Sequence, residues 1–535
     1  MRASCLPTLP SLLLGALLPL LAGGEIMHPN NNVASSRIKR SVNVEKDPAY
    51  WNNKAQETVK QHLFAERIEG RAKNVILFLG DGMSIPTLTA TRLYIGQKRG
   101  LSGEGQELSF EQFPYTGLSK TYCVDSPVAD SACSATAYLC GVKANYGTLG
   151  VSARVARKDC RAQRNSSTHV TSVFQWAQDA GKATGLVTTT RVTHASPAGA
   201  YAHTANRDWE SDAEVARDGV DPARCPDIAQ QLVRSSPGHN FEVVLGGGRR
   251  CFRPRSTVDE EGRRGSRLDG ADLVAEWQDD KDLRGASSHY AWDRRGLLDV
   301  DVAATDYLLG LFEADHMAYH LDADSRSEPT LPEMTAVAIA MLRKNPEGFF
   351  LFVEGGRIDH GHHENRAHKA LDEAEQLHEA VRLAVELTNS SDTLVVVTSD
   401  HAHVMTYSGY PARGGPVLGV AGYSDVDTLP YSTLSYANGP GYKQPQKNGT
   451  RYDISSDKLG DKDYEFPAMV PLRSETHGGD DVAVFARGPW AHLFSGVYEQ
   501  SVIPHLLGFA ACVGPGITAC SETDTLPWTA PEQFL

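Results

Sequence analysis

The stretch GFFLFVEGGRIDHGHH, residues 348–363, decides the fold class of this chain. Its apolar start, residues 348–353, is typical of a strand that is buried on both faces of a parallel or mixed sheet. Two carboxylates and three imidazoles follow within ten residues, which is costly unless they bind metal or are solvated. Asp359 and His363 stand four residues apart, so one helical turn places both on the same side, as two ligands of a single ion require.

Three further apolar runs are each followed by polar residues. Because ligands of such sheets bind beyond the carboxyl ends of the strands, all four runs deliver side chains to one edge. We therefore predict an α/β fold with a large, mixed, mostly parallel central sheet and helices on both faces. The runs and the polar residues after them are residues 74–79 before Asp81, residues 184–188 before His194 and Ser196, and residues 393–397 before Asp400 and His401.

Helical and irregular segments lie between the predicted strands. Residues 367–387 carry alanine, leucine and valine at spacings of three and four, which predicts an amphipathic helix with its stripe in the core. Residues 409–473 are rich in Gly, Pro, Tyr and Ser and indicate a smaller, loop-rich subdomain.

The charge balance argues against a nucleic-acid partner. The 535 residues include 52 basic and 66 acidic side chains, a formal net charge of −14. No run of Lys and Arg is visible, so a phosphate substrate would need positive charge from bound metals and from single arginines.

Both ends of the chain differ from the central part. Residues 1–24 have the pattern of a secretory signal and are too short for a membrane-spanning helix. Residues 25–43 are a propeptide cut after Arg40 or simply a solvated tail. We expect the folded catalytic region at residues 44–520, followed by a polar tail at residues 521–535.

An exported chain with eight cysteines outside the signal is expected to contain disulfides. Spacing does not fix the pairing: Cys512 and Cys520 would close a short loop, and Cys160 with Cys225 would staple the region between them. A buried free thiol is the alternative for each cysteine, and four stay unassigned: Cys123, Cys133, Cys140 and Cys251. Three asparagines have the form of glycosylation acceptors: Asn165, Asn389 and Asn448.

Taken singly, the other candidate residues have ordinary explanations. Asp81 between two glycines could be a turn residue, and His477 a core or loop histidine. Ser131 lies near the start of a predicted helix, where it would favour an anion but could equally be an N-cap. Arg207 could clamp two phosphate oxygens or form a salt bridge. Taken together with Asp359, they favour a two-zinc phosphohydrolase in which metal replaces the base of a catalytic triad.

The sequence resembles the alkaline phosphatase family, in particular its animal branch, from about residue 44 to residue 520. The stretches that match in order and spacing are residues 75–82, 128–148, 188–209, 348–363, 398–403 and 475–487.

The resemblance implies two zinc ions and one magnesium ion per chain. Ser131 corresponds to the nucleophile, which becomes phosphorylated, and Arg207 to the phosphate-binding arginine. His194 and His360 stand behind the metal ligands. The implied zinc ligands are Asp359, His363 and His477 for one ion, and Asp400, His401 and Asp81 for the other; Asp81, Ser196 and Glu354 are implied for magnesium.

Further family features are implied less directly. The helix around residues 51–68 resembles an arm that embraces a second subunit, so a homodimer is implied, and residues 409–473 resemble a crown subdomain. A calcium site is implied near Glu260 or Glu261, Phe312, Glu313 and Glu328. Calcium favours such oxygen ligands.

Two departures from the family pattern matter. Cys123 and Cys133 are additional and could form a disulfide that braces the segment around Ser131. Animal members usually exchange a hydrophobic tail for a glycosylphosphatidylinositol anchor, and no such tail precedes Leu535. We therefore expect a protein that is secreted or held on the extracellular face of the membrane.

The predicted reaction is hydrolysis of phosphate monoesters through a phosphoserine at Ser131, with an alkaline optimum. A phosphodiesterase or sulfatase of the same fold is the nearer alternative, although Ser131, Ser196 and Glu354 disfavour it. A binding protein that retains only the fold is the alternative from another class.

Overall fold

The computed structural model describes residues 44–521. The predicted signal at residues 1–24, the segment at residues 25–43 and residues 522–535 lie outside the described residues. Within them, the centre of the molecule is a 10-stranded sheet. Its strands, in spatial order, are β17 (Gly496–Glu499), β2 (Tyr115–Lys120), β16 (Val482–Arg487), β8 (Thr393–Thr398), β1 (Asn74–Gly80), β7 (Phe349–Gly355), β3 (Ala183–Arg191), β4 (Val243–Gly247), β6 (Tyr307–Leu311) and β5 (Ser288–Ala291).

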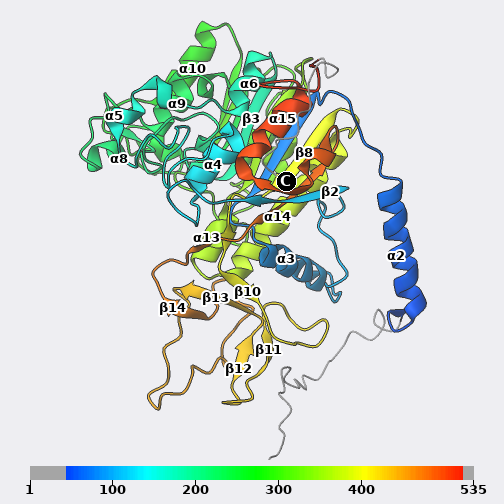
Figure 1. The fold of residues 1–535 in the computed structure, drawn as a ribbon. Coiled ribbons are helices and arrows are strands. Elements are labelled where there is room, and N and C mark those ends of the chain that lie inside the picture. Colours follow the sequence, from blue (N-terminus) through cyan, green and yellow to red (C-terminus); the bar gives the residue numbers. More distant parts are fainter. Residues whose placement is uncertain (1–43, 522–535) are drawn as a thin grey trace, which may run out of the picture.

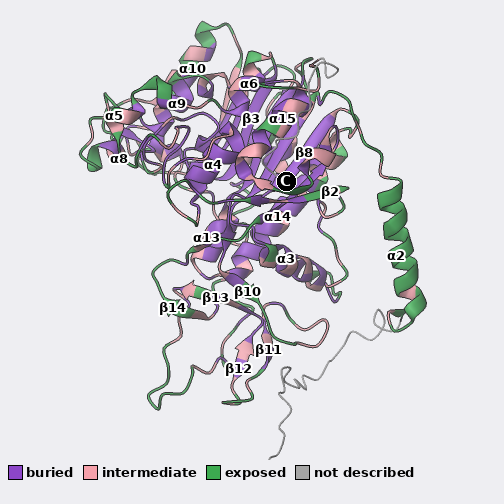
Figure 2. Cartoon of the chain, viewed as in Figure 1, coloured by how far each residue is buried: buried purple, intermediate pink, exposed green. Residues whose placement is uncertain are grey.

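The pairing confirms a mixed, mostly parallel sheet. All neighbours from β8 through to β5 pair in parallel, and β16 runs antiparallel to β2 and β8 on either side of it. The four strands predicted from apolar runs lie side by side as β8, β1, β7 and β3. Nearly all of their residues are buried because helices cover both faces of the sheet, as the purple centre of Figure 2 shows.

Side chains alternate between the two faces of the sheet along each strand, so they pack into two separate hydrophobic clusters. In β1, Ile76 and Phe78 enter one cluster, whereas Val75 and Leu77 enter the other. The first cluster is covered mainly by α3 (Ile85–Lys98), α12 (Leu331–Leu342) and α14 (Ala367–Leu387). The second is covered by α4 (Ser131–Cys140), α6 (Val173–Asp179), α9 (Ile228–Arg234), α10 (Leu273–Leu283) and α15 (Ile503–Ala511).

Short helices fill the connections. They are α5 (Cys160–Gln163), α7 (Ala195–Ala198), α8 (Asp212–Arg217), α11 (Arg294–Leu298) and α13 (Arg357–His363), with 3₁₀ turns η1 (Ser166–Thr168), η2 (Gly238–Asn240), η3 (Arg249–Cys251), η4 (Ala491–Phe494) and η5 (Gln500–Val502).

Helix α14 has the predicted bounds and the predicted apolar stripe, but it also buries polar groups. Glu373 is 2% exposed, and its Oε1 accepts a hydrogen bond from the backbone N–H of His320 at 2.7 Å. Burial raises the pKa of Glu373 to about 7. Folded protein therefore binds a proton at this position at a pH where the unfolded chain does not.

Substituting Glu373→Gln is expected to stabilise the protein above pH 7. Because the pKa of the folded state is raised, the wild type loses stability as pH rises from 4.5 to about 7, whereas the uncharged variant does not. The gap in unfolding free energy should widen by up to about 3 kcal/mol across that window. Urea denaturation of both chelated proteins at several pH values measures it. The exposed Glu386→Gln is the control. A gap independent of pH would contradict the assignment.

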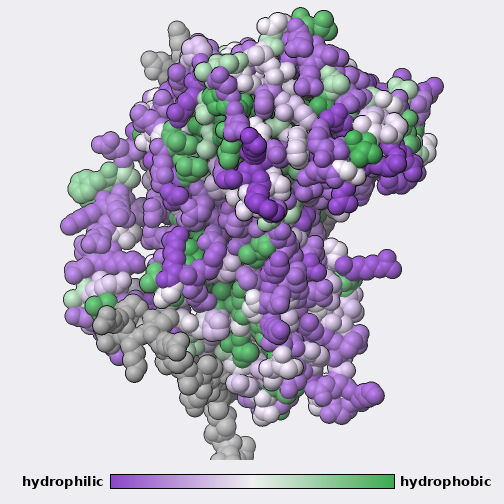
Figure 3. Space-filling model, turned by 180° about the vertical axis from the view of Figure 1, so that it is seen from behind, coloured by the Kyte–Doolittle hydropathy of each residue, from purple (hydrophilic) through white to green (hydrophobic). Residues whose placement is uncertain are grey.

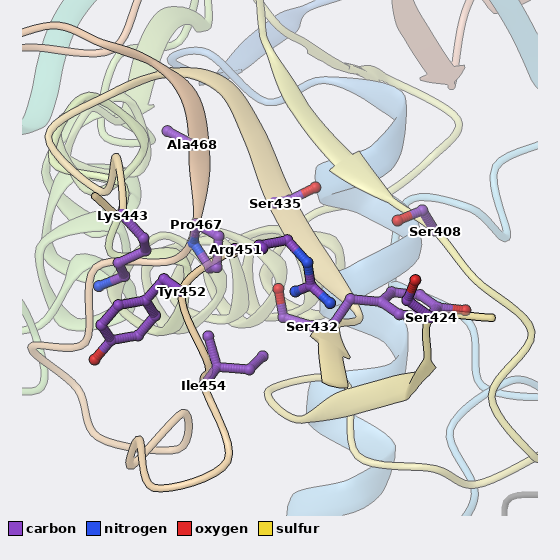
Figure 4. A pocket seen from close by; sticks show the side chains of 11 residues that line it. Ser408, Ser424, Ser432, Ser435, Lys443, Arg451, Tyr452, Ile454, Pro467 and Ala468 are labelled. Carbon is purple, nitrogen blue, oxygen red and sulfur yellow. The ribbon is translucent and has the colours of Figure 1, made fainter. Parts of the chain in front are cut away.

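Residues 405–471 form two small sheets below the main body in Figure 1. One contains β10 (Met405–Tyr407), β13 (Leu434–Gly439) and β14 (Ala468–Pro471), and the other pairs β11 (Val420–Tyr423) with β12 (Pro430–Ser432). Strand β10 lies just before the segment predicted as a crown, residues 409–473, and the other strands lie within it. Between them lies a cavity of about 360 Å³, lined by Lys443, Arg451, Tyr452 and several serines (Figure 4). None of its lining residues was predicted to be catalytic.

Helix α2 (Pro48–Leu63) stands apart from the body of the chain (Figure 1). It begins where Asp47 caps the backbone N–H of Ala49 and Pro48 occupies the first turn. It ends before the predicted residue 68. None of its residues is buried, and Trp51 is half exposed.

The described residues form three disulfides, which confirms that the chain is disulfide-bonded. They join Cys123 to Cys133, Cys160 to Cys225 and Cys512 to Cys520. Cys140 and Cys251 are buried free thiols.

Candidate functional site

The predicted site residues meet at the carboxyl edge of the four central strands. Asp81 follows β1, Glu354 lies near the end of β7, and Asp400 with His401 follows β8. Strand β3 leads to His194 and Ser196, and β7 leads into α13, which carries Asp359, His360 and His363. The edge predicted from the four apolar runs is therefore the place where these side chains converge.

Asp359, His363 and His477 form one possible metal-binding group. Asp359 Oδ2 lies 3.3 Å from His363 Nε2, and Asp359 Oδ1 lies 3.3 Å from His477 Nε2. His477 has no local sequence signal. His477 lies at the site because β15 (His477–Gly478) pairs with β9 (Ala402–His403), which places His477 opposite His403 just after β8.

His403 is buried in the same group, but both of its nitrogens already face carboxylates. Nε2 lies 2.7 Å from Asp359 Oδ1, and Nδ1 lies 2.5 Å from Glu475 Oε2. Burial alone would lower its pKa, but Glu475 and Asp359 raise it to about 10. His403 therefore orients Asp359 from behind. Sequence reasoning missed Glu475, because nothing local links it to His403.

Asp81, Asp359 and His401 form a second group, with ligand atoms within 4.8 Å of one another. His401 Nε2 lies 3.1 Å from Asp400 Oδ2 and 3.5 Å from Asp81 Oδ1. Both carboxylate oxygens of Asp81 are buried and accept no hydrogen bond from the described residues. Burial and the neighbouring carboxylates of Asp400, Asp359 and Glu354 raise the pKa of Asp81 well above its usual range.

A third group contains Asp81, His194 and Glu354. Glu354 is fully buried and accepts hydrogen bonds from Thr188 and Thr190, which sequence reasoning missed. Burial raises the pKa of Glu354 to about 7, while the hydroxyls of Thr188 and Ser196 act in the opposite direction.

These three groups fit divalent cations. Buried carboxylates as crowded as Asp81, Glu354 and Asp400 are stable only if protonated or neutralised, and among residues 44–521 the two oxygens of Asp81 have no hydrogen-bond partner. The imidazoles and carboxylates of the first two groups are typical zinc ligands. The oxygens of Asp81, Glu354 and Ser196 suit magnesium.

Ser131 is the first residue of α4, and Asp130 is the N-cap, so the alternative of a capping serine is wrong. Asp130 Oδ1 accepts a hydrogen bond from the backbone N–H of Cys133 at 3.2 Å. Ser131 Oγ therefore stays free of the helix end and lies 3.2 Å from His401 Nε2. The serine faces the second metal-binding group at a helix N-terminus, where an anion is stabilised.

Arg207 lies close to Ser131, because it binds the neighbouring residue Asp130. Its Nη1 donates to Asp130 Oδ2 at 2.9 Å, and its Nη2 lies 3.2 Å from His194 Nε2. The side chain is 18% exposed. Salt bridge and phosphate clamp are therefore compatible roles, because Asp130 holds the guanidinium beside Ser131.

His194 and His360 lie in a group with His316, which sequence reasoning missed. The ring centroids of His316 and His360 are 4.3 Å apart, and those of His194 and His360 are 5.6 Å apart. Arginines adjoin the group: Arg191 lies 2.6 Å from His316 Nε2, and Arg357 lies 3.1 Å from His360 Nδ1. The ligand atoms of these three histidines lie within 4.8 Å of one another, so they could also hold an ion, and the place of His194 and His360 behind the metal ligands stays a prediction.

The acidic region implied for calcium favours Glu261 over Glu260. Glu260 pairs with Arg253 at 3.0 Å. What distinguishes Glu261 is its nearness to the other two carboxylates: burial, then Glu313 and Glu261, raise the pKa of Glu328 to about 7, and burial and Glu261 also raise the pKa of Glu313. Glu261 also pairs with Arg249. The Phe312 side chain is 1% exposed and apolar, so only its backbone carbonyl could bind an ion.

Comparison with known proteins decides the family. The family model described as alkaline phosphatase matches residues 72–513. The chain belongs to the alkaline phosphatase family. It is 51% identical to a membrane-bound alkaline phosphatase of Bombyx mori, over 94% of this chain and 92% of that protein. It is 53% identical to the tissue-nonspecific isozyme of Gallus gallus, over 89% and 92%.

Solved structures agree on the fold. Alkaline phosphatase from Thermus thermophilus has a TM-score of 0.59 at 24% identity and covers 85% of this chain and 94% of its own. The enzyme from the Antarctic bacterium TAB5 has a TM-score of 0.57 at 24% identity, over 83% and 99%.

Membership in the family makes this chain a phosphomonoester hydrolase that depends on divalent metal cofactors, for which candidate ligand groups are present. No helix between residues 44 and 521 is both long and apolar enough to cross a membrane.

Proposed function

We propose that Ser131 is the nucleophile of a two-step phosphomonoesterase. In the first step its Oγ forms a bond to phosphorus while the ester P–O bond breaks and the alcohol leaves. In the second step water attacks the phosphoserine, inorganic phosphate leaves and Ser131 is regenerated. The observation that carries the proposal is Ser131 Oγ, at the N-terminus of α4, 3.2 Å from His401 Nε2.

The charged residues around Ser131 have separate tasks in this proposal. When bound, two zinc ions and one magnesium ion would supply the positive charge that lowers the pKa of the serine hydroxyl and stabilises the phosphoryl oxygens. Arg207 would bind two of those oxygens, held by Asp130, and His403 would fix Asp359. The proposed holders are Asp359, His363 and His477 for one zinc, Asp400, His401 and Asp81 for the other, and Asp81, Ser196 and Glu354 for magnesium.

We further propose that the catalytic region, residues 44–520 with the crown at 409–473, forms a homodimer through α2. A helix with no buried residue gains little from its own chain, and Figure 3 shows apolar side chains exposed on it beside hydrophilic ones. The apolar residues exposed there and just after it are Trp51, Val59, Leu63 and Phe64.

The proposed location is extracellular, secreted or on the outer face of the membrane. Three disulfides support it, because they persist in oxidising compartments. Asn165, Asn389 and Asn448 are exposed, as glycosylation requires.

We also propose a calcium site formed by Glu261, Glu313 and Glu328.

Metal content measured together with turnover tests the metal assignment. We expect about two zinc ions per chain by mass spectrometry and hydrolysis of p-nitrophenyl phosphate near pH 10 that a chelator abolishes and added zinc restores. Turnover that survives removal of all zinc would contradict the assignment. The control is Asp208→Asn, which changes an exposed carboxylate beside Arg207 and is expected to keep both zinc and activity.

A further inference from the structure

The segment between β2 and α4, residues 121–130, touches three parts of the proposed site at once. The carbonyl oxygen of Ala129 faces His477 Nδ1 at 2.7 Å. Asp130 binds Arg207 at 2.9 Å through one oxygen and caps α4 through the other. Ser131 follows directly. A shift of this segment would therefore move a proposed zinc ligand, the phosphate-binding arginine and the nucleophile together.

Little hydrophobic packing holds this segment. Its only cluster of buried apolar residues contains four small side chains, Cys123, Ala129, Cys133 and Ala144, and is separate from both large cores. On the outer side, residues 120–127 line an open hollow of about 570 Å³. Tyr122 and Val124 are 43% and 55% exposed.

The remaining ties go mainly to residues 143–146, beyond the end of α4. The backbone N–H of Val124 donates to Ala144 at 3.0 Å, and that of Tyr146 donates to the Asp125 carboxylate at 2.8 Å. These hydrogen bonds fix the first half of the segment. One further hydrogen bond, from the backbone N–H of Gly147 to Asp130 Oδ1 at 2.9 Å, reaches the N-cap of α4.

The Cys123–Cys133 disulfide adds a covalent connection between the first half of the segment and the first turn of α4. Cys123 lies in the anchored first half of the segment, and Cys133 lies in the first turn of α4, two residues after Ser131. Their Cα atoms are held 5.7 Å apart, and both side chains are 2% exposed. The bond thus closes a ring of eleven residues, 123 to 133, that contains Ala129, Asp130 and Ser131.

We propose that the Cys123–Cys133 disulfide is a positioning element for catalysis: it holds Ala129, Asp130 and Ser131 in register with His477, Arg207 and the second metal-binding group. The proposal rests on the proposed function of Ser131 and Arg207. The Ala129 carbonyl fixes the tautomer of His477, so that Nε2 faces Asp359 and His363. Without the disulfide, the protein still folds, but Ala129, Asp130 and Ser131 are held less firmly at these positions.

The test compares two double variants. Cys123→Ala with Cys133→Ala removes the proposed element, whose cysteines have a sequence separation of 10. Cys512→Ala with Cys520→Ala removes a disulfide with a sequence separation of 8, which touches none of the proposed site residues. For the first variant we expect kcat/KM to fall roughly 10-fold or more, because loss of an outer contact to a metal ligand typically costs 10–100-fold in activity or metal affinity. For the control we expect less than a 2-fold change.

Two further readouts separate positioning from general stabilisation. Inhibition by inorganic phosphate should weaken roughly 10-fold in the first variant, because Arg207 is no longer aligned, and zinc should be lost at lower chelator concentration. A purely structural bond would lower the melting temperature of both variants and leave kcat/KM, phosphate inhibition and zinc affinity unchanged in both. That result would overturn the proposal.

A second measurement applies if the first variant does not fold. Wild-type enzyme is treated with a phosphine reductant while the urea concentration is raised. The concentration used is the one at which thiol labelling first detects Cys133 and circular dichroism still reports folded protein. Activity that falls in step with Cys133 labelling supports the proposal, and activity independent of it rejects it. Wild-type-like turnover in Ser131→Ala would instead mean that the proposed function of Ser131 itself fails.

Discussion

Replacing Ser131 by alanine is expected to lower kcat/KM for p-nitrophenyl phosphate by roughly 10³-fold or more. The variant loses the oxygen that forms the covalent bond, and no other described hydroxyl occupies its position 3.2 Å from His401 Nε2. Binding should persist, because Arg207 keeps its contact with Asp130. We therefore expect a small change in zinc content and in the inhibition constant of inorganic phosphate. Steady-state kinetics and mass spectrometry of both proteins measure these quantities.

The control for this experiment lies one turn further along α4. Ser134 is also buried, but its Oγ donates to the backbone carbonyl of Asp130 at 3.0 Å and lies 3.5 Å from Asp400 Oδ2, so it is already hydrogen-bonded and, unlike Ser131 Oγ, does not face His401. Ser134→Ala should change kcat/KM less than 10-fold. Brief incubation of wild type with labelled substrate at acid pH should also trap a phosphoserine at Ser131. Wild-type-like turnover in Ser131→Ala would rule out the covalent route.

The sheet and most of the site could be predicted because their signals are local. Each of the four central strands contains a short apolar run, and polar residues after such a run must lie at the carboxyl edge. Helix α14 matches its prediction residue for residue, since its apolar spacing extends over the whole of residues 367–387. Asp359 and His363 share a helical turn, which fixed their relation in advance.

The parts that were missed depend on contacts between distant segments. Glu475 is recognisable only once β15 pairs with β9 and brings it against His403. His316 lies in a loop after β6 and meets His360 only through packing. The choice between Glu260 and Glu261 depends on which carboxylate turns toward Arg253, and spacing does not encode that.

Asp81 connects catalysis and stability, because it lies in two of the metal-binding groups. With metal bound, Asp81→Asn should lower kcat/KM roughly 10²-fold or more and reduce the zinc content, since a carboxamide is a weaker ligand than a carboxylate. Without metal the effect on stability should reverse. The chelated wild type must bury a carboxylate that accepts no hydrogen bond from the described residues and lies beside Asp400, Asp359 and Glu354.

The chelated Asp81→Asn variant is therefore expected to be more stable than the chelated wild type by about 2 kcal/mol near pH 8. The pKa of Asp81 is raised in the folded state, so the wild type loses stability as pH rises above the usual aspartate range, and the gap should shrink toward pH 4. Urea denaturation with and without zinc measures both signs. A variant less stable in both states would show that Asp81 serves the fold itself, whereas opposite signs mean that the metal offsets a cost built into the sheet edge.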